Sequence, residues 1–401
     1  MIRKHLLRLG LLLLAIPGAA STPETLDGFL REGRIKEGLT AFATPSGEAG
    51  RFSLGVLQAL DGLQQFSAGM HNVGINPAFI QSGIPFFRVV VPGRLQNPKE
   101  PATPAKVARL FQDLRASLRR ANATLAKVGD EEFGVEVNLS QVRLDLDGAG
   151  QCSTNEMLLV SLGRTFGLPA QARDSRDVIV RFDSADAVWL KGYTHFLSGM
   201  LDLLLAYDWR PVWDQCAHVV FLQPEPLPPM ARFSQGGQGF DQWVDLIAAV
   251  HDMRLNLIDK DGPRRARDEF KTMVTCSRIC WQRVLAETDD QKEWLPSPRQ
   301  TGPSGATITQ AQVDAWKRVL DELDAIASGK KLLPHWRMKP GVGINVEKLV
   351  ASPPPLDLVL LIQGSALIPY LEEGAVSDRG TWSQLTRAFE GGFFRFAIWS
   401  N

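Results

Sequence analysis

Residues 183–209, DSADAVWLKGYTHFLSGMLDLLLAYDW, form the most apolar helical pattern of the chain beyond its N-terminal region. Large apolar side chains recur there at helical spacing, at Trp189, Tyr193, Phe196, Met200 and Leu204. A stripe with this period predicts a helix that buries one face. We therefore expect this helix at the centre of the core, with the rest of the chain packed around it.

Amphipathic patterns on both sides of this segment predict further helices. They cover residues 23–43, 50–74, 104–129, 240–253, 264–287 and 309–329, and the first two form a hairpin split at 44–47. Short alternating or apolar runs predict strands at residues 85–92, 135–139, 142–146, 356–364 and 393–401. The sequence thus predicts a mainly α fold, a single large helical domain with a few short β-strands.

The first twenty residues have the pattern of an export signal. Arg3, Lys4 and Arg8 provide a basic start, residues 9–16 are apolar, and small residues follow at 17–20. The apolar run is shorter than the ~20 residues that a membrane span needs, and no later segment is long and apolar enough. We expect a signal peptide at 1–20, one mostly helical domain at 21–401, no permanent membrane span, and a periplasmic or secreted location.

Charge and cysteine content exclude other classes of protein. The chain has 44 basic and 44 acidic residues, whereas a nucleic-acid-binding protein needs a basic face. The four cysteines are too few for a disulfide framework in a chain of this length. Cys276 and Cys280 lie four residues apart on one predicted helix, where a bridge would strain the backbone. We expect both to be free, buried thiols.

Residues 145–156, DLDGAGQCSTNE, resemble the twelve-residue calcium loop of the EF-hand family. Asp145, Asp147 and Glu156 occupy ligand positions 1, 3 and 12, and Gly150 falls at position 6, where the family makes a sharp turn. Carboxylate oxygens are the ligands that calcium prefers. The resemblance implies one structural calcium ion in this loop.

The remaining loop positions fit a calcium site less well, and some of them also fit a helix cap. Gln151 would offer its backbone carbonyl and Ser153 would bind through water, but Ala149 at position 5 has no side-chain oxygen. The alternative is a capping box, in which Ser153 begins a helix and Glu156 reaches back to its amide. That alternative leaves Asp145 without a role, so we favour a degenerate calcium site.

Catalytic motifs are weaker than the calcium loop. Ser365 follows an apolar run, but Gln363 and Leu367 replace both glycines of the nucleophile elbow. Residues 287–302 form a polar loop in which acidic residues around 289–293 precede Trp294. Paired carboxylates near tryptophan suit sugar hydrolysis, although a solvated loop anchored by Trp294 explains the same pattern.

The six histidines show no zinc-binding spacing. His195 and His218 could meet in space to hold a metal, although the sequence does not require it. His251 follows Phe240 and Ile247 on one helical face, which predicts a core histidine. No cofactor other than calcium is expected.

The chain resembles a group of exported bacterial proteins of unknown function. The resemblance is carried by the export signal, the helical hairpin, RLDLDG at 143–148, HFLSGMLDLLLAYDW at 195–209 and EWLPSPRQTG at 293–302. This resemblance implies an exported protein and no particular reaction. We expect a non-enzymatic binding or structural protein of the envelope, whose partner is an unknown ligand or envelope protein. The alternative is a secreted hydrolase that uses the acidic residues around 289–293.

Overall fold

The computed structural model describes residues 24–76, 98–160, 177–233, 240–377, 379–389 and 392–400. Two expectations lie outside these residues: the signal at 1–20 and the strand at 85–92.

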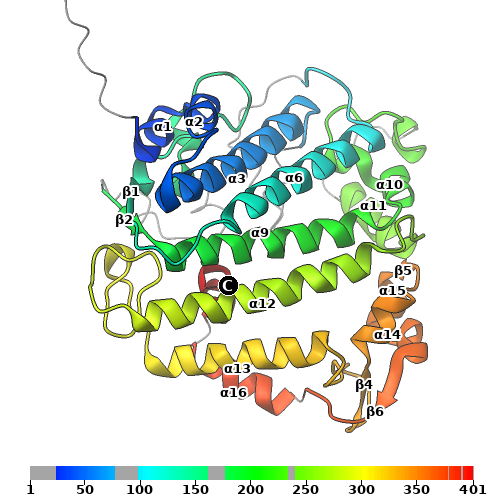
Figure 1. Ribbon diagram of the computed structural model, residues 1–401. Coiled ribbons are helices and arrows are strands. Elements are labelled where there is room, and N and C mark those ends of the chain that lie inside the picture. Colours follow the sequence, from blue (N-terminus) through cyan, green and yellow to red (C-terminus); the bar gives the residue numbers. More distant parts are fainter. Residues whose placement is uncertain are drawn as a thin grey trace, which may run out of the picture.

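Five long helices lie side by side and form a slab, with successive helices running in alternating directions (Figure 1). In chain order they are α3 (Gly47–Asn72), α6 (Pro104–Leu125), α9 (Ser184–Leu205), α12 (Gly262–Ala286) and α13 (Gln310–Ala327). The predicted mainly α class with a few short strands is confirmed. The predicted central helix, α9, lies in the middle of the slab between α6 and α12.

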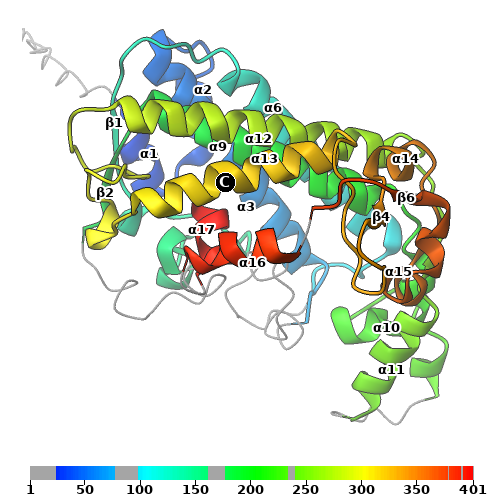
Figure 2. The ribbon, with the colours of Figure 1, turned by 90° about the horizontal axis from the view of Figure 1, so that it is seen from below.

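Smaller elements gather at the two ends of the slab and on one face (Figures 1 and 2). One end holds α1 (Leu26–Glu32), α2 (Ile35–Ala41) and the antiparallel pair β1 (Val135–Asn138) and β2 (Ile179–Phe182). The other end holds four helices, α10 (Arg210–Val220), α11 (Phe240–His251), α14 (Val346–Ala351) and α15 (Leu358–Gln363). It also holds two antiparallel strand pairs. In one, β3 (Arg254–Leu255) pairs with β5 (Leu356–Asp357), and in the other, β4 (Val342–Ile344) pairs with β6 (Leu371–Glu373). α16 (Arg379–Arg387) and α17 (Phe393–Ser400) lie against one face of the slab.

Small residues allow α9 to approach its neighbours closely. The side chains that α9 buries are mostly small or polar, and they include Gly192, Ser198 and Gly199. A Cβ atom at Gly199 would lie 2.8 Å from the ring of Phe270 on α12. The large apolar side chains of the predicted stripe are only half-buried.

A buried carboxylate joins the three central helices. Asp202 on α9 is fully buried, and its two oxygens each accept a hydrogen bond at 2.8 Å, one from Arg115 and one from Arg119 of α6. Arg265 of α12 lies 3.4 Å from the same carboxylate. A buried charge is tolerated only where such partners surround it, so this cluster determines how α6, α9 and α12 pack.

Several predicted elements are wrong in type. The segment at 23–43 is two short helices, because Gly33 adopts φ +71° and ends α1. Residues 142–146 form no strand, and β1 pairs instead with β2, which the sequence analysis did not predict. The predicted strands at 356–364 and 393–401 are mainly α15 and α17. Short apolar runs do not distinguish a strand from a buried helix.

The helix predicted at 240–253 is confirmed as α11, but the predicted burial of its apolar face is wrong. Phe240, Ile247 and His251 lie on the exposed side of the helix. Its buried side is formed around Ala249, and the carboxylate of Asp245 also faces the protein. His251 is therefore not a core histidine.

We predict that Asp202→Ala lowers the free energy of unfolding by about 3 kcal/mol, because it leaves three guanidinium groups without their shared anion. Denaturant unfolding measures the loss. The matched control is Asp321→Ala, which removes an exposed ion pair with Arg278 and should lower the free energy of unfolding by less than about 1 kcal/mol. Equal losses in the two variants would show that the buried Asp202 carboxylate stabilises the fold no more than an exposed ion pair does.

Candidate functional site

The loop at 145–156 folds around the carboxylate of Glu156. One oxygen of this side chain accepts hydrogen bonds from the backbone N–H groups of Leu146 at 2.9 Å and Asp147 at 3.1 Å. The other accepts from the N–H of Ser153 at 2.7 Å, and together with Ser153 it completes the capping box. Glu156 is almost fully buried, so it organises the loop from inside.

The two aspartates of the loop turn toward the same point. One oxygen each of Asp145, Asp147 and Glu156 lies within 4.8 Å of the others. The second oxygen of Asp145 accepts a hydrogen bond from the N–H of Gly150, which has φ +78° as the turn requires. The remaining Asp145 oxygen is buried and has no hydrogen-bond partner among the described residues. Such an orphaned acceptor fits a cation.

The other predicted ligands are less well placed for an EF-hand. Gln151 is exposed, and Ser153 serves as the N-cap of a short 3₁₀ turn over Thr154–Glu156. The segment before the loop contains no α-helix, since Leu139–Gln141 is a 3₁₀ turn and residues 142–146 are irregular. The resemblance therefore extends over the loop but not over the helix that precedes EF-hand loops.

A second carboxylate cluster joins segments far apart in the sequence. Asp183 caps the start of α9, Glu287 follows the end of α12, and Glu293 lies in the loop toward α13. One oxygen from each of these three side chains lies within 4.8 Å of the others. Asp186, whose carboxylate accepts a hydrogen bond from the N–H of Asp183 at 3.1 Å, adjoins them. These residues could hold a hard divalent cation.

Burial makes this cluster unusual electrostatically. Asp186 and Glu293 are each only 5 % exposed, and among the described residues none of the four carboxyl groups forms an ion pair. Burial, with the neighbouring Asp183, raises the pKa of Asp186 well above its ordinary value. Burial is also the main cause that raises the pKa of Glu287 to about 8. Protons, or a cation, must therefore balance the negative charge here.

The sequence analysis identified only part of this cluster. Of the acidic residues around 289–293, Glu293 joins it, whereas Asp290 accepts a hydrogen bond from the N–H of Thr301 within its own loop. Trp294 anchors the loop against Trp189 at 5.4 Å between ring centroids, as the alternative interpretation expected. Asp183 was missed, although an aspartate before a helical pattern, with another acidic residue three positions later, is a recognisable capping signal.

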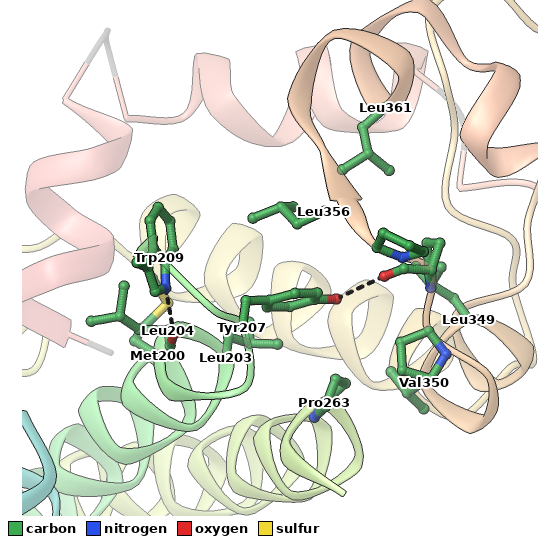
Figure 3. A pocket seen from close by; sticks show the side chains of 13 residues that line it. Met200, Leu203, Leu204, Tyr207, Trp209, Pro263, Leu349, Val350, Leu356 and Leu361 are labelled. Atoms are coloured by element: carbon green, nitrogen blue, oxygen red, sulfur yellow. Dashed lines mark hydrogen bonds between the residues drawn. The ribbon is translucent and has the colours of Figure 1, made fainter. Parts of the chain in front are cut away.

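An apolar cavity of about 380 Å³ lies where the end of α9 meets the segment 349–361 (Figure 3). Its lining consists of Met200, Leu203, Leu204, Tyr207, Trp209, Pro263, Leu349, Val350, Pro353, Pro354, Pro355, Leu356 and Leu361. Two of these side chains carry a polar group, and each of these groups already donates a hydrogen bond to a backbone carbonyl. The Tyr207 hydroxyl donates to the Pro354 carbonyl at 3.3 Å, and the Trp209 indole N–H donates to the Leu204 carbonyl at 2.7 Å.

The histidines and cysteines form no metal site with each other among the described residues. His195 lies against Glu269 at 2.5 Å and His218 against Asp245 at 2.9 Å, so the two histidines do not share a ligand. All four cysteines are free thiols, as predicted for Cys276 and Cys280, and both of these are buried.

Comparisons with known proteins add no function. No family model, no curated protein and no solved structure matches this chain. Within the described residues, no helix combines the length and apolar character that crossing a membrane would require.

We predict that the protein loses stability as the pH rises from about 5 to about 8. The pKa of Glu287 is raised from 4.5 to about 8, so its stabilising contribution is complete below pH 4.5 and disappears as the pH passes the folded-state value. Glu287→Gln stays neutral and should reduce this loss by about 2 kcal/mol, less than the full linkage value because the carboxyl group is partly exposed.

Urea unfolding in EDTA at several pH values measures this effect without a bound metal. Glu373→Gln, at an exposed carboxylate on β6, is the matched control and should keep the pH dependence of the wild type. If Glu287→Gln also keeps the pH dependence of the wild type, a raised pKa of Glu287 is not the cause of that pH dependence.

Proposed function

We propose that this protein is an exported, non-enzymatic binding protein of the cell envelope that holds an apolar group in the cavity of Figure 3. One observation carries the proposal: the cavity is lined by apolar side chains, and its Tyr207 and Trp209 donors are already hydrogen-bonded to the backbone. Catalysis needs polar groups that are free to act on a substrate. An apolar lining without such groups supports binding instead.

The size of the cavity supports a small ligand or part of a larger one. Ligand pockets commonly measure about 300–1,000 Å³, so about 380 Å³ suits a short hydrocarbon chain or a compact ring system. Binding would be driven by removing apolar surface from water, at roughly 25 cal/mol per Å². With no free polar side chain in the lining to orient the ligand, selectivity would follow the shape and hydrophobicity of the ligand.

Calcium in the loop at 145–156 is the second part of the proposal. The buried, unpartnered oxygen of Asp145 supports it, because the capping box explains Ser153 and Glu156 but leaves this atom unsatisfied. The oxygens of Glu156 already accept three backbone N–H groups, and Ala149 supplies no ligand. Binding should therefore be weak and structural, within roughly the 10⁻⁴ to 10⁻³ M range of extracellular modules.

A secreted hydrolase is the second candidate function. The observation that favours it is Glu287, which keeps a proton at neutral pH beside Asp183 and Glu293. A protonated carboxyl next to an ionisable one is the arrangement of a general acid and its partner. A hydrolytic activity that Glu287→Gln abolishes while folding is retained would favour this candidate over the binding protein.

We predict that the wild type binds an uncharged apolar dye, such as N-phenyl-1-naphthylamine, at one saturable site from which decanol displaces it. Val350→Trp should weaken dye binding about tenfold, because the larger side chain fills the cavity that Val350 lines. Val359→Trp, at an exposed valine of α15 outside the lining, is the matched control. Fluorescence titration measures both, and equal affinity in the two variants would contradict cavity binding.

We also predict that calcium at ten times its dissociation constant stabilises the fold by about 1.4 kcal/mol, and that Asp145→Ala removes this effect. The capping box does not use the Asp145 side chain, so this variant separates a metal site from a helix cap. Thermal unfolding with millimolar calcium or with EDTA measures the shift. An unchanged melting temperature in the wild type would leave the loop as a turn and cap alone.

A further inference from the structure

α11 is an amphipathic helix with its polar side turned toward the protein. Asp245 lies 2.9 Å from His218 of α10, and Asp252, just after α11, accepts a hydrogen bond at 2.8 Å from Gln215 of α10. The buried Ala249 packs on the same side, against α10. These contacts hold α11 in one rotation about its axis.

The opposite side of α11 is apolar and faces solvent. Phe240 is 80 % exposed, Trp243 65 % and Ile247 67 %. Val244 and Val250 are exposed on the same side, so five large apolar residues recur at helical spacing on a face that no described segment buries. Folded proteins seldom leave a patch of this kind in water unless something binds it.

Neighbouring segments extend the exposed apolar surface at this end of the molecule. Met230 and Phe233, shortly before α11 in the chain, are 65 % and 84 % exposed. α15 contacts α11 and exposes three further residues, Val359, Leu360 and Ile362. α10, α11 and α15 project together from one end of the slab (Figure 2). Because α15 also lines the apolar cavity through Leu361, this surface adjoins the proposed binding site.

The composition and position of this surface favour a lipid bilayer as its partner. Its residues come from separate short segments at a projecting end, and a fluid surface fits such a relief more readily than a rigid protein groove does. Trp243 and Phe240 are side chains that partition into the interface of a bilayer. α11 contains Asp241 and Asp245 and neither lysine nor arginine, and His251 is its one basic residue, so its charge gives no reason to prefer an anionic headgroup.

We propose that the α11 surface, defined by Phe240, Trp243, Val244, Ile247 and Val250, docks on a zwitterionic lipid bilayer with the helix lying in the interface. This docking goes beyond the proposed ligand binding and does not require it. A bilayer would cover the apolar face of α11 and remove its exposed side chains from water. The hydrogen bonds of Asp245 and Asp252 to α10 would fix the orientation of the helix.

Co-sedimentation with phosphatidylcholine vesicles tests the docking. The wild-type chain should pellet with the vesicles, and the double variant Trp243→Asp, Ile247→Asp should partition about tenfold more weakly, because two apolar anchors become charged. Ile179→Asp, at an exposed isoleucine of β2 at the far end of the slab, is the matched control. All variants carry the same N-terminal region, so a difference between them reports the α11 surface.

Further conditions separate this proposal from its competitors. Binding that persists in 0.5 M salt, does not strengthen with phosphatidylglycerol, and persists in Val350→Trp supports docking through apolar contacts independent of the cavity. Equal vesicle binding by wild type and double variant overturns the proposal. A second result also overturns it: light scattering shows a dimer for the wild type but not for the double variant, and the two bind vesicles equally. The α11 surface would then join two copies of this chain. Circular dichroism confirms that each variant is folded.

Discussion

The carboxylate of Asp202 is the constraint on which the slab depends. It is buried on α9 and takes its hydrogen bonds from Arg115 and Arg119 of α6, while Arg265 approaches from α12. A single buried anion thus fixes the relative register of three helices. The small residues of α9 make this possible, since bulkier side chains would keep α6 and α12 too far apart for their guanidinium groups to reach one carboxylate.

The long helices could be predicted from the sequence because their apolar period is regular, and three of them also begin at a capping residue. Thr103 caps α6, Asp183 caps α9 and Thr309 caps α13, each through a side-chain oxygen that accepts a backbone N–H. The short elements could not be predicted in the same way. Residues 393–399 are apolar except for Arg395, and it is tertiary packing, such as that of Phe396 against Trp281 and Trp316, that favours a helix there over a strand.

Periodicity also reveals an apolar face without revealing what covers it. α11 has the pattern of a core helix, yet Phe240 and Ile247 are exposed, because Asp245 finds its partner on α10. The same limit applies to the candidate sites. The loop at 145–156 is contiguous and was recognisable, whereas Asp183 and Glu287 lie on different helices and meet only through the packing of α9 against α12. One such residue, Glu293, could be suspected from its acidic neighbours.

The close contact at Gly199 has a mechanical consequence. With no side chain between the α9 backbone and the Phe270 ring, and with Asp202 bonded across the neighbouring helices, α9 and α12 have no room to slide past one another. Packed interfaces shift between discrete arrangements and do not deform continuously. α9 and α12 should therefore move together as one rigid body. The segment that follows α9 is also tied down, because the N–H of Asp208 donates to the Asn256 carbonyl and the N–H of Ile258 donates to the Ala206 carbonyl, so the end of α9 is fixed to the chain that leads into α12.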